Sequence, residues 1–480
     1  MLILMEILKI INLLLLGVIT YYFINLLVQQ YYSYPRMIRA IFSHAKYYLL
    51  VLMIIDGLSI FFYKHLCFYL YHLISSIIWI LIFGKAKFSF TRRKCFLFLV
   101  SGLTIISLSY FFPFLLSFKL FSFLFFILLS LTVLSPIETL IKEYYIKKAK
   151  KRLKKCSSLR IIGITGSFGK SSFRHYLYEI LSTKYAVKTP SKNINTLMGI
   201  TKYINNEFED CDILILELGI DQKNQMRRFK KLFKLDDAIV TSIGNMHLAS
   251  FKSIDNVIKE KLKIKDLLKD PKNLYLNYDN QYLKKIDENE VTFFSNKNIE
   301  LMKYDINGLE ISFKDKSYLF PVHQIFFTTY LDGIIKISKK YGISEEIVCQ
   351  NSFIFKDYER RNQVFLLDNG YLIDNSYNAN LEGIRSSLVL LDTLSGTSFI
   401  ITGGIIEQGK NFALENQKLA KLFENRNIIF IGEKNHPLIK NHKFKKLIIT
   451  KNINSAYKLI RDIKPNNILL LSKGENIFLR

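Results

Sequence analysis

Cysteine is scarce in this chain of 480 residues, and the scarcity has structural consequences. The five cysteines show no paired spacing and no CxxC motif, which argues against a disulfide framework and a zinc site and suits a reducing compartment. Charged residues make up 22% of the chain and hydrophobic residues 50%, a composition that excludes a disordered or fibrous protein. The residues after position 141 leave room for two ordinary globular domains.

Charge of both signs is also scarce in residues 1–141, which hold 11 Lys and Arg and three acidic residues, Glu6, Asp56 and Glu138. Crossing a bilayer takes about 20 apolar residues. We therefore expect about five membrane-spanning helices at the long apolar runs, residues 7–28, 47–63, 66–84, 95–118 and 120–141. Basic residues gather in the loops after the first and third runs, and such loops lie in the cytoplasm. These features predict a multi-pass protein of the cell membrane, with the lipid bilayer as a partner and the chain after residue 142 in the cytoplasm.

A basic segment, residues 142–158, follows, and it adds to a formal net charge of 67 − 40 = +27. Two interpretations are open. The favoured one is a juxtamembrane linker held to anionic lipid headgroups. The other is nucleic-acid binding, but no groove-reading or base-stacking motif accompanies the charge, so we expect no nucleic-acid partner.

A glycine-rich turn then stands between a strand and a helix. Residues 159–165 (LRIIGIT) form a short β-branched run typical of a buried parallel strand, and residues 173–183 have a helical pattern. The turn between them reads GSFGKSS. Its backbone N–H groups would cradle phosphates at a helix N-terminus, with Lys170 as the mobile cation and Ser171 as a Mg²⁺ ligand. The strict P-loop pattern is not met, because Ile164 stands where its first glycine would fall.

Two further apolar strands lead into polar residues. Residues 211–216 (CDILIL) lead into Glu217, and residues 237–243 lead towards His247. Ligands of open α/β sheets bind at the carboxyl ends of the strands, so both side chains are candidate site residues.

The helix expected over residues 254–269 places a lysine on its buried face. Lys261 falls near the middle of the apolar stripe and Lys265 lies nearly as close, so periodicity leaves both open. A lysine on a buried face needs a partner or a modification.

Together these residues resemble the Mur ligases, the ATP-dependent amide ligases of peptidoglycan precursor synthesis, and their MurF type in particular, in a membrane-anchored form. The motifs that carry the resemblance are residues 163–171 (GITGSFGKS), 189–190 (TP), 195–199 (NTLMG), 217–219 (ELG), 243–248 (IGNMHL), 276–279 (LNYD), 361–364 (RNQV), 373–380 (IDNSYNAN) and 402–409 (TGGIIEQG). The fold class it implies is a helical transmembrane region followed by α/β domains. The implied parts are a membrane domain (1–141), a basic linker (142–158), a central P-loop-type ATPase domain (159–350) and a Rossmann-like C-terminal ligase domain (355–480).

The resemblance also implies amide formation through an acyl phosphate, with ATP and Mg²⁺. The catalytic residues would be Lys170, His247, Lys261 and Arg361, with Lys261 carbamylated. The nucleotide would be bound by Thr165, Gly166, Ser167, Phe168, Gly169, Lys170, Ser171, Ser172, Arg361, Asp374, Asn375 and Asn378. The metal ligands would be Ser171, Glu217, His247 and Lys261, and Asn195 and Thr196 would contact the substrate.

Two departures from the family pattern bear on the adenine or ribose contacts. The family's double Asp before Ser-Tyr-Asn is Asp374-Asn375 here, and its His-Asn near the end of the central domain is His323-Gln324.

The leading hypothesis is a membrane-anchored ligase that joins an amino acid or dipeptide to a nucleotide- or lipid-linked cell-wall precursor. One alternative is a ligase that builds a polymer of the poly-γ-glutamate type. An alternative from another class is a nucleotide-binding membrane transporter or regulator, which would not require His247 and Lys261.

Overall fold

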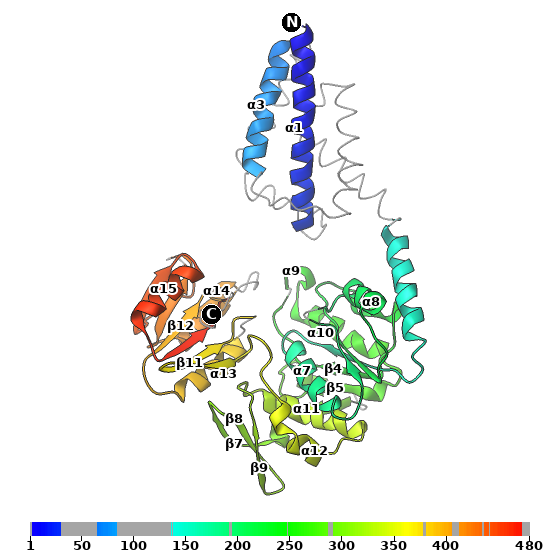
Figure 1. Cartoon of the computed structure of the whole chain (residues 1–480), viewed down its shortest axis with the longest axis vertical. Coiled ribbons are helices and arrows are strands. Elements are labelled where there is room, and N and C mark those ends of the chain that lie inside the picture. Colours follow the sequence, from blue (N-terminus) through cyan, green and yellow to red (C-terminus); the bar gives the residue numbers. More distant parts are fainter. Residues whose placement is uncertain are drawn as a thin grey trace. The chain divides into compact units, whose positions relative to one another are not determined.

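The computed structural model describes residues 2–29, 65–83, 136, 138–191, 194–246, 248–286, 291–377, 381–405, 412–433, 436–440 and 442–472. Contacts divide the chain into two compact units, residues 1–143 and 144–480. Figure 1 shows the elements of each unit coloured along the sequence.

The first unit contains α1 (Leu2–Gln29) and α3 (Leu66–Phe83), which pack against each other. A buried amide joins them. Asn12 on α1 donates its side-chain N–H groups to the carbonyl oxygens of Leu8, at 2.9 Å, and of Tyr69 on α3, at 2.8 Å. His72 on α3 is also fully buried. The two helices are therefore held together by polar as well as apolar contacts.

The prediction of a transmembrane N-terminal region is wrong for the part of the chain that the structure describes. No helix there is both long enough and apolar enough to cross a membrane. Outside the described residues lie the spans expected at 47–63 and 95–118 and most of the span expected at 120–141. The predicted localisation is not tested by this finding and stays a prediction.

The second unit begins with helical residues 144–153, which bury Ile146, Ala149 and Leu153 in the core of the central sheet. The strands of that sheet are β1 (Arg160–Thr165), β2 (Val187–Lys188), β3 (Ile213–Glu217), β4 (Asp237–Val240), β5 (Leu274–Asn277) and β6 (Val291–Phe294). They are all parallel, in the order β2-β3-β1-β4-β5-β6. The helices of this part are α7 (Lys170–Leu181), α8 (Leu197–Asn206), α9 (Leu248–Phe251), α10 (Ile254–Leu262), α11 (Phe327–Lys340) and α12 (Glu345–Gln350). The α/β architecture expected after the N-terminal region is thus present.

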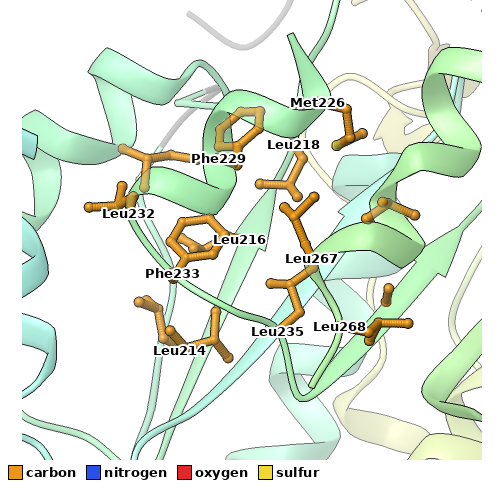
Figure 2. Packing of buried hydrophobic residues seen from close by; sticks show 14 of the residues in the cluster. Leu214, Leu216, Leu218, Met226, Phe229, Leu232, Phe233, Leu235, Leu267 and Leu268 are labelled. Atoms are coloured by element: carbon orange, nitrogen blue, oxygen red, sulfur yellow. The ribbon is translucent and has the colours of Figure 1, made fainter. Parts of the chain in front are cut away.

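Both faces of the central sheet are buried, as is usual for parallel sheets. On β3, Leu214 and Leu216 enter one apolar core, whereas Ile213 and Ile215 enter the core on the opposite face. Figure 2 shows the first core, where these leucines lie near Phe233, with Phe229 in the same cluster. β3 is apolar on both sides up to its carboxyl end, where Glu217 is the first polar residue. Glu217 is therefore a candidate site residue.

Two more sheets complete the unit. The antiparallel sheet consists of β7 (Glu300–Asp305), β8 (Gly308–Phe313) and β9 (Lys316–Phe320). The C-terminal sheet consists of β10 (Gln363–Leu367), β11 (Gly370–Asp374), β12 (Ser398–Thr402), β13 (Asn427–Ile431), β14 (Lys446–Thr450) and β15 (Asn467–Leu470), with helices α13 (Leu381–Asp392), α14 (Phe412–Leu422) and α15 (Ile453–Ile463). Its order is β10-β11-β15-β12-β13-β14, and every pair is parallel except β10 with β11.

Candidate active site

The order of the central sheet brings the carboxyl ends of three strands together. β1 pairs with β3, with Ile164 opposite Glu217, and with β4 on its other side, with Thr165 opposite Val240. The strands that follow β1 in the chain are thus placed first on one side of it (β2, β3) and then on the other (β4, β5, β6). Ligands of open α/β sheets bind where the strand order reverses in this way. The glycine-rich turn after β1, Glu217 after β3 and the residues after β4 share this edge.

The glycine-rich turn, residues 166–169, is held in shape by residues that follow β4. The backbone N–H of Phe168 donates to Ser242 Oγ at 2.9 Å, and the Thr241 hydroxyl donates to the carbonyl oxygen of Phe168 at 2.6 Å. Ser167 Oγ accepts a hydrogen bond from the N–H of Gly244 at 2.9 Å. These bonds form the turn in advance of any ligand, which lowers the entropy that binding would cost.

Gly169 ends the turn and caps α7 in a left-handed conformation, with φ of 79°. A Cβ at this position would lie 1.7 Å from the Tyr330 hydroxyl oxygen, so a larger residue does not fit. Helix α7 begins directly after it at Lys170, three residues earlier than the sequence pattern predicts. Its unpaired N–H groups and the positive end of its dipole therefore face the turn, as an anion site requires.

Two lysines, a partly buried Lys170 and a buried Lys261, converge on one carbonyl oxygen of the turn. Nζ of Lys170 lies 2.7 Å, and Nζ of Lys261 3.0 Å, from the oxygen of Gly166. Burial lowers the pKa of Lys261 well below its ordinary value, and the positive charge of Lys170 lowers it further. Burial also lowers the pKa of Lys170. The fold thus concentrates cationic groups beside a preformed phosphate-type turn.

The structure decides between the two lysines that periodicity left open. Helix α10 ends at Leu262, and residues Lys263–Leu267 continue as a 3₁₀ helix. The tighter winding moves Lys265 off the apolar stripe and leaves it exposed, whereas Lys261 is 3% exposed.

Glu217 is paired with an arginine that sequence reasoning missed. Its side chain is 1% exposed, and Oε1 lies 3.2 Å from Nε of Arg174 on α7. Arg174 also donates to the carbonyl oxygen of Pro190, at 3.0 Å, and to the Tyr358 hydroxyl, at 3.3 Å. The available signal was its position four residues after Lys170, which puts both side chains on one helix face.

Arg361 reaches the site from the segment between the central and C-terminal sheets. Its guanidinium carbon lies 4.6 Å from the ring centre of Tyr358 and 4.2 Å from that of Tyr377, so the cation is stacked between two aromatic rings. The pKa of Lys170 is lowered mainly by burial, and the positive charge of Arg361 lowers it further. Arg361 therefore lies close enough to Lys170 for the two cations to repel each other.

The remaining residues assigned to the turn and to the nucleotide lie as follows. The Thr165 hydroxyl donates to the carbonyl oxygen of Leu218 at 2.9 Å, and Ser171 is 7% exposed in the first turn of α7. Asp374 is buried at the end of β11, where it accepts from the N–H of Ser376 at 3.0 Å. Asn375 donates to Ser387 Oγ at 2.8 Å, so its amide is engaged within the C-terminal part. His247 and Asn378 lie outside the described residues.

The loop of Asn195 and Thr196, which were expected to contact the substrate, lies beside the end of β3. The carbonyl oxygen of Asn195 accepts from the N–H of Gly219 at 2.7 Å, and a Cβ on Gly219 would lie 2.6 Å from Cγ of Asn195. Thr196 caps α8, with its Oγ1 accepting from the N–H of Gly199 at 3.2 Å. The loop is therefore fixed near Glu217 by backbone contacts.

The donor set fits a hard cation. Mg²⁺ prefers oxygen ligands, and Glu217 and Ser171 supply a carboxylate and a hydroxyl. Oε1 of Glu217 is buried and lies 3.2 Å from Nε of Arg174, and no residue that the structure describes donates a hydrogen bond to it. Within the described ranges no group of three or more His, Cys, Asp or Glu side chains could hold a metal, and His247 is not among those residues.

Comparison with known proteins gives one family match. Residues 164–338 match the model of the Mur ligase middle domain. A relative from Buchnera aphidicola (subsp. Acyrthosiphon pisum), named UDP-N-acetylmuramoyl-tripeptide–D-alanyl-D-alanine ligase, is 24% identical over 346 residues, which cover 67% of this chain and 75% of the relative. A Bacillus subtilis relative of the same name is 23% identical over 260 residues, which cover 52% of this chain and 57% of the relative, little more than half its length.

Solved structures show the same fold. The MurF ligase of Thermotoga maritima in complex with ADP superposes with a TM-score of 0.59 at 20% identity and covers 69% of this chain and 80% of that one. MurF of Acinetobacter baumannii gives a TM-score of 0.59 at 19% identity and covers 70% of this chain and 77% of that one.

Proposed function

We propose that this chain, which is a Mur ligase of the MurF type, uses ATP to join a carboxyl group of a peptidoglycan precursor to the amine of an amino acid or dipeptide. It is an enzyme, an ATP-dependent ligase, and the resemblance to MurF-type Mur ligases inferred from its motifs is confirmed, whereas the membrane-anchored form is not supported. The observation that carries the proposal is the convergence of Lys170 and Lys261 on the oxygen of Gly166. A protein that merely bound a nucleotide would have no need of a second lysine at this oxygen, the buried Lys261.

The turn and α7 bind the phosphates in this proposal. Backbone N–H groups of the turn point at the anion from the helix N-terminus, and Lys170 moves from the Gly166 oxygen to the phosphate oxygens. Arg361 adds a second cation from the neighbouring segment. The cations offset the repulsion between the γ-phosphate and the attacking substrate carboxylate and hold the two for an in-line reaction.

Glu217 and Ser171 would hold Mg²⁺, which neutralises phosphate charge when it is bound. Oε1 of Glu217 supports this assignment, because it is ion-paired with Arg174 but accepts no hydrogen bond from any described residue. His247 is proposed as a further ligand on the strength of the resemblance.

Lys261 is proposed to be carbamylated. The depressed pKa leaves more of its amine unprotonated at neutral pH, and that form attacks CO₂ to give a carbamate with release of one proton. The modification turns a buried cation into an oxygen anion that suits a hard metal. It also removes the repulsion between Lys261 and Lys170.

The substrates are proposed from the relatives. The acid would be a nucleotide-linked muramoyl tripeptide, with a lipid-linked form as the variant to test, and the amine would be D-alanyl-D-alanine. The amide bond forms when the amine displaces phosphate from the acyl phosphate, so each bond made yields one ADP and one phosphate.

The test is ADP formation by the purified full chain. UDP-N-acetylmuramoyl-tripeptide and its lipid-linked counterpart are each combined with D-alanyl-D-alanine or single amino acids, with and without bicarbonate. The proposal expects ADP only when an acid and an amine are both present, together with a new amide in the product. ATP turnover indifferent to every pair would overturn it.

A further inference from the structure

Gln324 is buried, at 2% exposed, between the phosphate-binding helix and the segment that carries Arg361. Its amide nitrogen donates to the backbone carbonyl oxygen of Arg361 at 2.8 Å and to the Tyr176 hydroxyl at 3.2 Å. Its amide oxygen accepts from the Ser172 hydroxyl at 3.4 Å. One side chain therefore joins the first two turns of α7 to the backbone of Arg361.

The backbone on both sides of Arg361 needs such support. Arg360 has φ of 56° and Asn362 has φ of 59°, left-handed conformations that carry a steric cost for residues with a Cβ. Strained backbone persists only where the surroundings hold it. Asn362 is held by its side chain, which donates to the carbonyl oxygen of His323 at 2.6 Å. The carbonyl between the two strained residues is the one that Gln324 holds.

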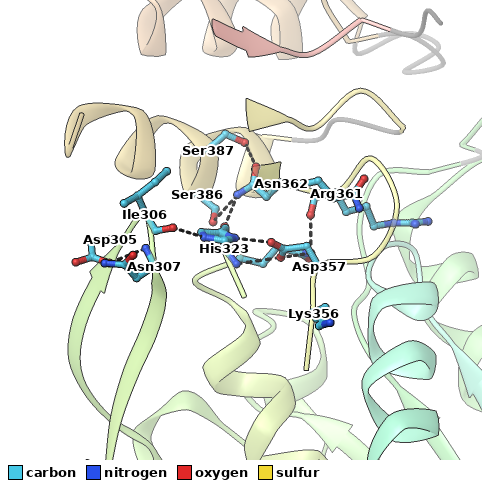
Figure 3. A network of polar contacts seen from close by, with 12 residues as sticks. Asp305, Ile306, Asn307, His323, Lys356, Asp357, Arg361, Asn362, Ser386 and Ser387 are labelled. Atoms are coloured by element: carbon cyan, nitrogen blue, oxygen red, sulfur yellow. Dashed lines mark hydrogen bonds and ion pairs between the residues drawn. The ribbon is translucent and has the colours of Figure 1, made fainter. Parts of the chain in front are cut away.

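The junction around Arg361 is polar and closely connected. Figure 3 shows Arg361 beside Asp357, His323 and Asn362. The Gln324 nitrogen also lies 3.5 Å from Oδ1 of Asp357, whose Oδ2 is 2.6 Å from Nδ1 of His323. A change at Gln324 is therefore felt by the whole segment from Asp357 to Asn362.

We propose that Gln324 is a positioning residue, which fixes the backbone of Arg361 so that its guanidinium, stacked between Tyr358 and Tyr377, meets the phosphates bound at the turn. The inference rests on the proposed function, because ATP supplies those phosphates. It also agrees with the expectation that the departure from the family pattern at position 324 bears on the adenine or ribose contacts. Both polar ends of the Gln324 amide already bond to protein groups, so little hydrogen-bonding capacity is left for a nucleotide.

The first arm of the test needs no ligase activity. Gln324→Met keeps the length of the side chain and removes its hydrogen bonds, and Gln350→Met, at the exposed end of α12, is the matched control. Hydrogen exchange of the peptide covering residues 357–363 is measured in the full chain without nucleotide. We expect the exchange to be about tenfold faster in Gln324→Met and unchanged in the control. Equal exchange in both variants would overturn the proposal.

The second arm measures kcat and KM for ATP with the substrate pair found active. Gln324→Met is expected to lower kcat about tenfold with KM for ATP within about twofold, because the interaction acts on the reacting phosphate. In an Arg361→Ala background the same substitution is expected to lower kcat less than about twofold, since it acts through that arginine. The proposal would be overturned if Gln324→Met lowered kcat about tenfold in the Arg361→Ala background as well. It would also be overturned if Gln324→Met raised KM for ATP and left kcat unchanged. A wild-type chain that forms no ADP with any pair refutes the proposed function, and the exchange measurement still decides the role of Gln324.

Discussion

The ammonium groups of Lys170 and Lys261 share the carbonyl oxygen of Gly166 as a contact, at 2.7 and 3.0 Å. Bringing two cations together in a buried place is costly unless an anion separates them. Lys170 meets that requirement when a phosphate binds. Lys261 lies deeper, and the proposed carbamate would meet the requirement by making this group an anion.

Replacing Lys261 by Ala should abolish most of the activity while leaving the fold intact. The rate of ADP formation is expected to fall about 100-fold or more, the size of effect seen when one electrostatic group of a reaction centre is lost. The melting temperature should not fall, because the ammonium group contacts a carbonyl oxygen and burial opposes its charge. Lys259→Ala, on the exposed side of α10, is the control and should keep full activity. Activity retained in Lys261→Ala would refute the role.

Sequence reasoning reached these lysines for identifiable reasons and missed Arg174 for equally clear ones. Lys170 is marked by its glycine-rich turn, and Lys261 by its place on an apolar stripe. The partners of Arg174 include Glu217, Pro190 and Tyr358, and the last is 184 residues away. No local pattern records such contacts, because they exist only once the strands and the domain junction are assembled.

Among the elements, β4 shows how a strand end is adapted to the site. The apolar run over residues 237–243 predicts a strand of seven residues, but β4 ends at Val240. The next residues turn away so that Thr241 and Ser242 can bond to Phe168. Likewise α10 gives way to a 3₁₀ helix at Lys263, where the pattern predicts an uninterrupted helix over residues 254–269. The period of the apolar residues indicates the type of element, whereas its end depends on bonds to other elements.

Replacing Gly169 by Ala should damage the turn and the start of α7. The new Cβ would lie 1.7 Å from the Tyr330 hydroxyl oxygen in a backbone with φ of 79°. We expect a loss of about 1–3 kcal/mol in the free energy of unfolding from the strained backbone. ADP affinity, measured by calorimetry, should fall at least about tenfold, because the N–H groups no longer converge. Unchanged ADP affinity would show that the turn is not the phosphate site.

At the scale of the whole second unit, His323 connects parts far apart in the sequence. Its Nε2 lies 2.7 Å from the carbonyl oxygen of Ile306, after β7, and its Nδ1 lies 2.6 Å from Oδ2 of Asp357. A carbonyl oxygen only accepts, so Nε2 carries a proton. Burial opposes the imidazolium, but the hydrogen bond and charge of Asp357 outweigh it and raise the pKa of His323. The charged ring helps to hold the domain junction together.

This raised pKa predicts a pH dependence of stability. The folded state holds the His323 proton more tightly than the unfolded state, so the stabilisation is fully present below pH about 6.5 and is lost as the pH rises through the folded-state pKa. We expect the melting temperature of wild type to be higher than that of His323→Gln. The difference should be largest near pH 6 and should shrink towards pH 9. A difference that stays constant over this range would contradict the raised pKa.

The measurement that tests the central claim most directly follows oxygen from the substrate to phosphate. The acid substrate is labelled with ¹⁸O in its carboxyl group and turned over with ATP and the amine. An acyl phosphate intermediate transfers one carboxyl oxygen to the phosphate that the amine displaces, so the account predicts one ¹⁸O in each phosphate released. Phosphate without substrate-derived ¹⁸O, formed at the same rate as ADP, would contradict the ligase mechanism.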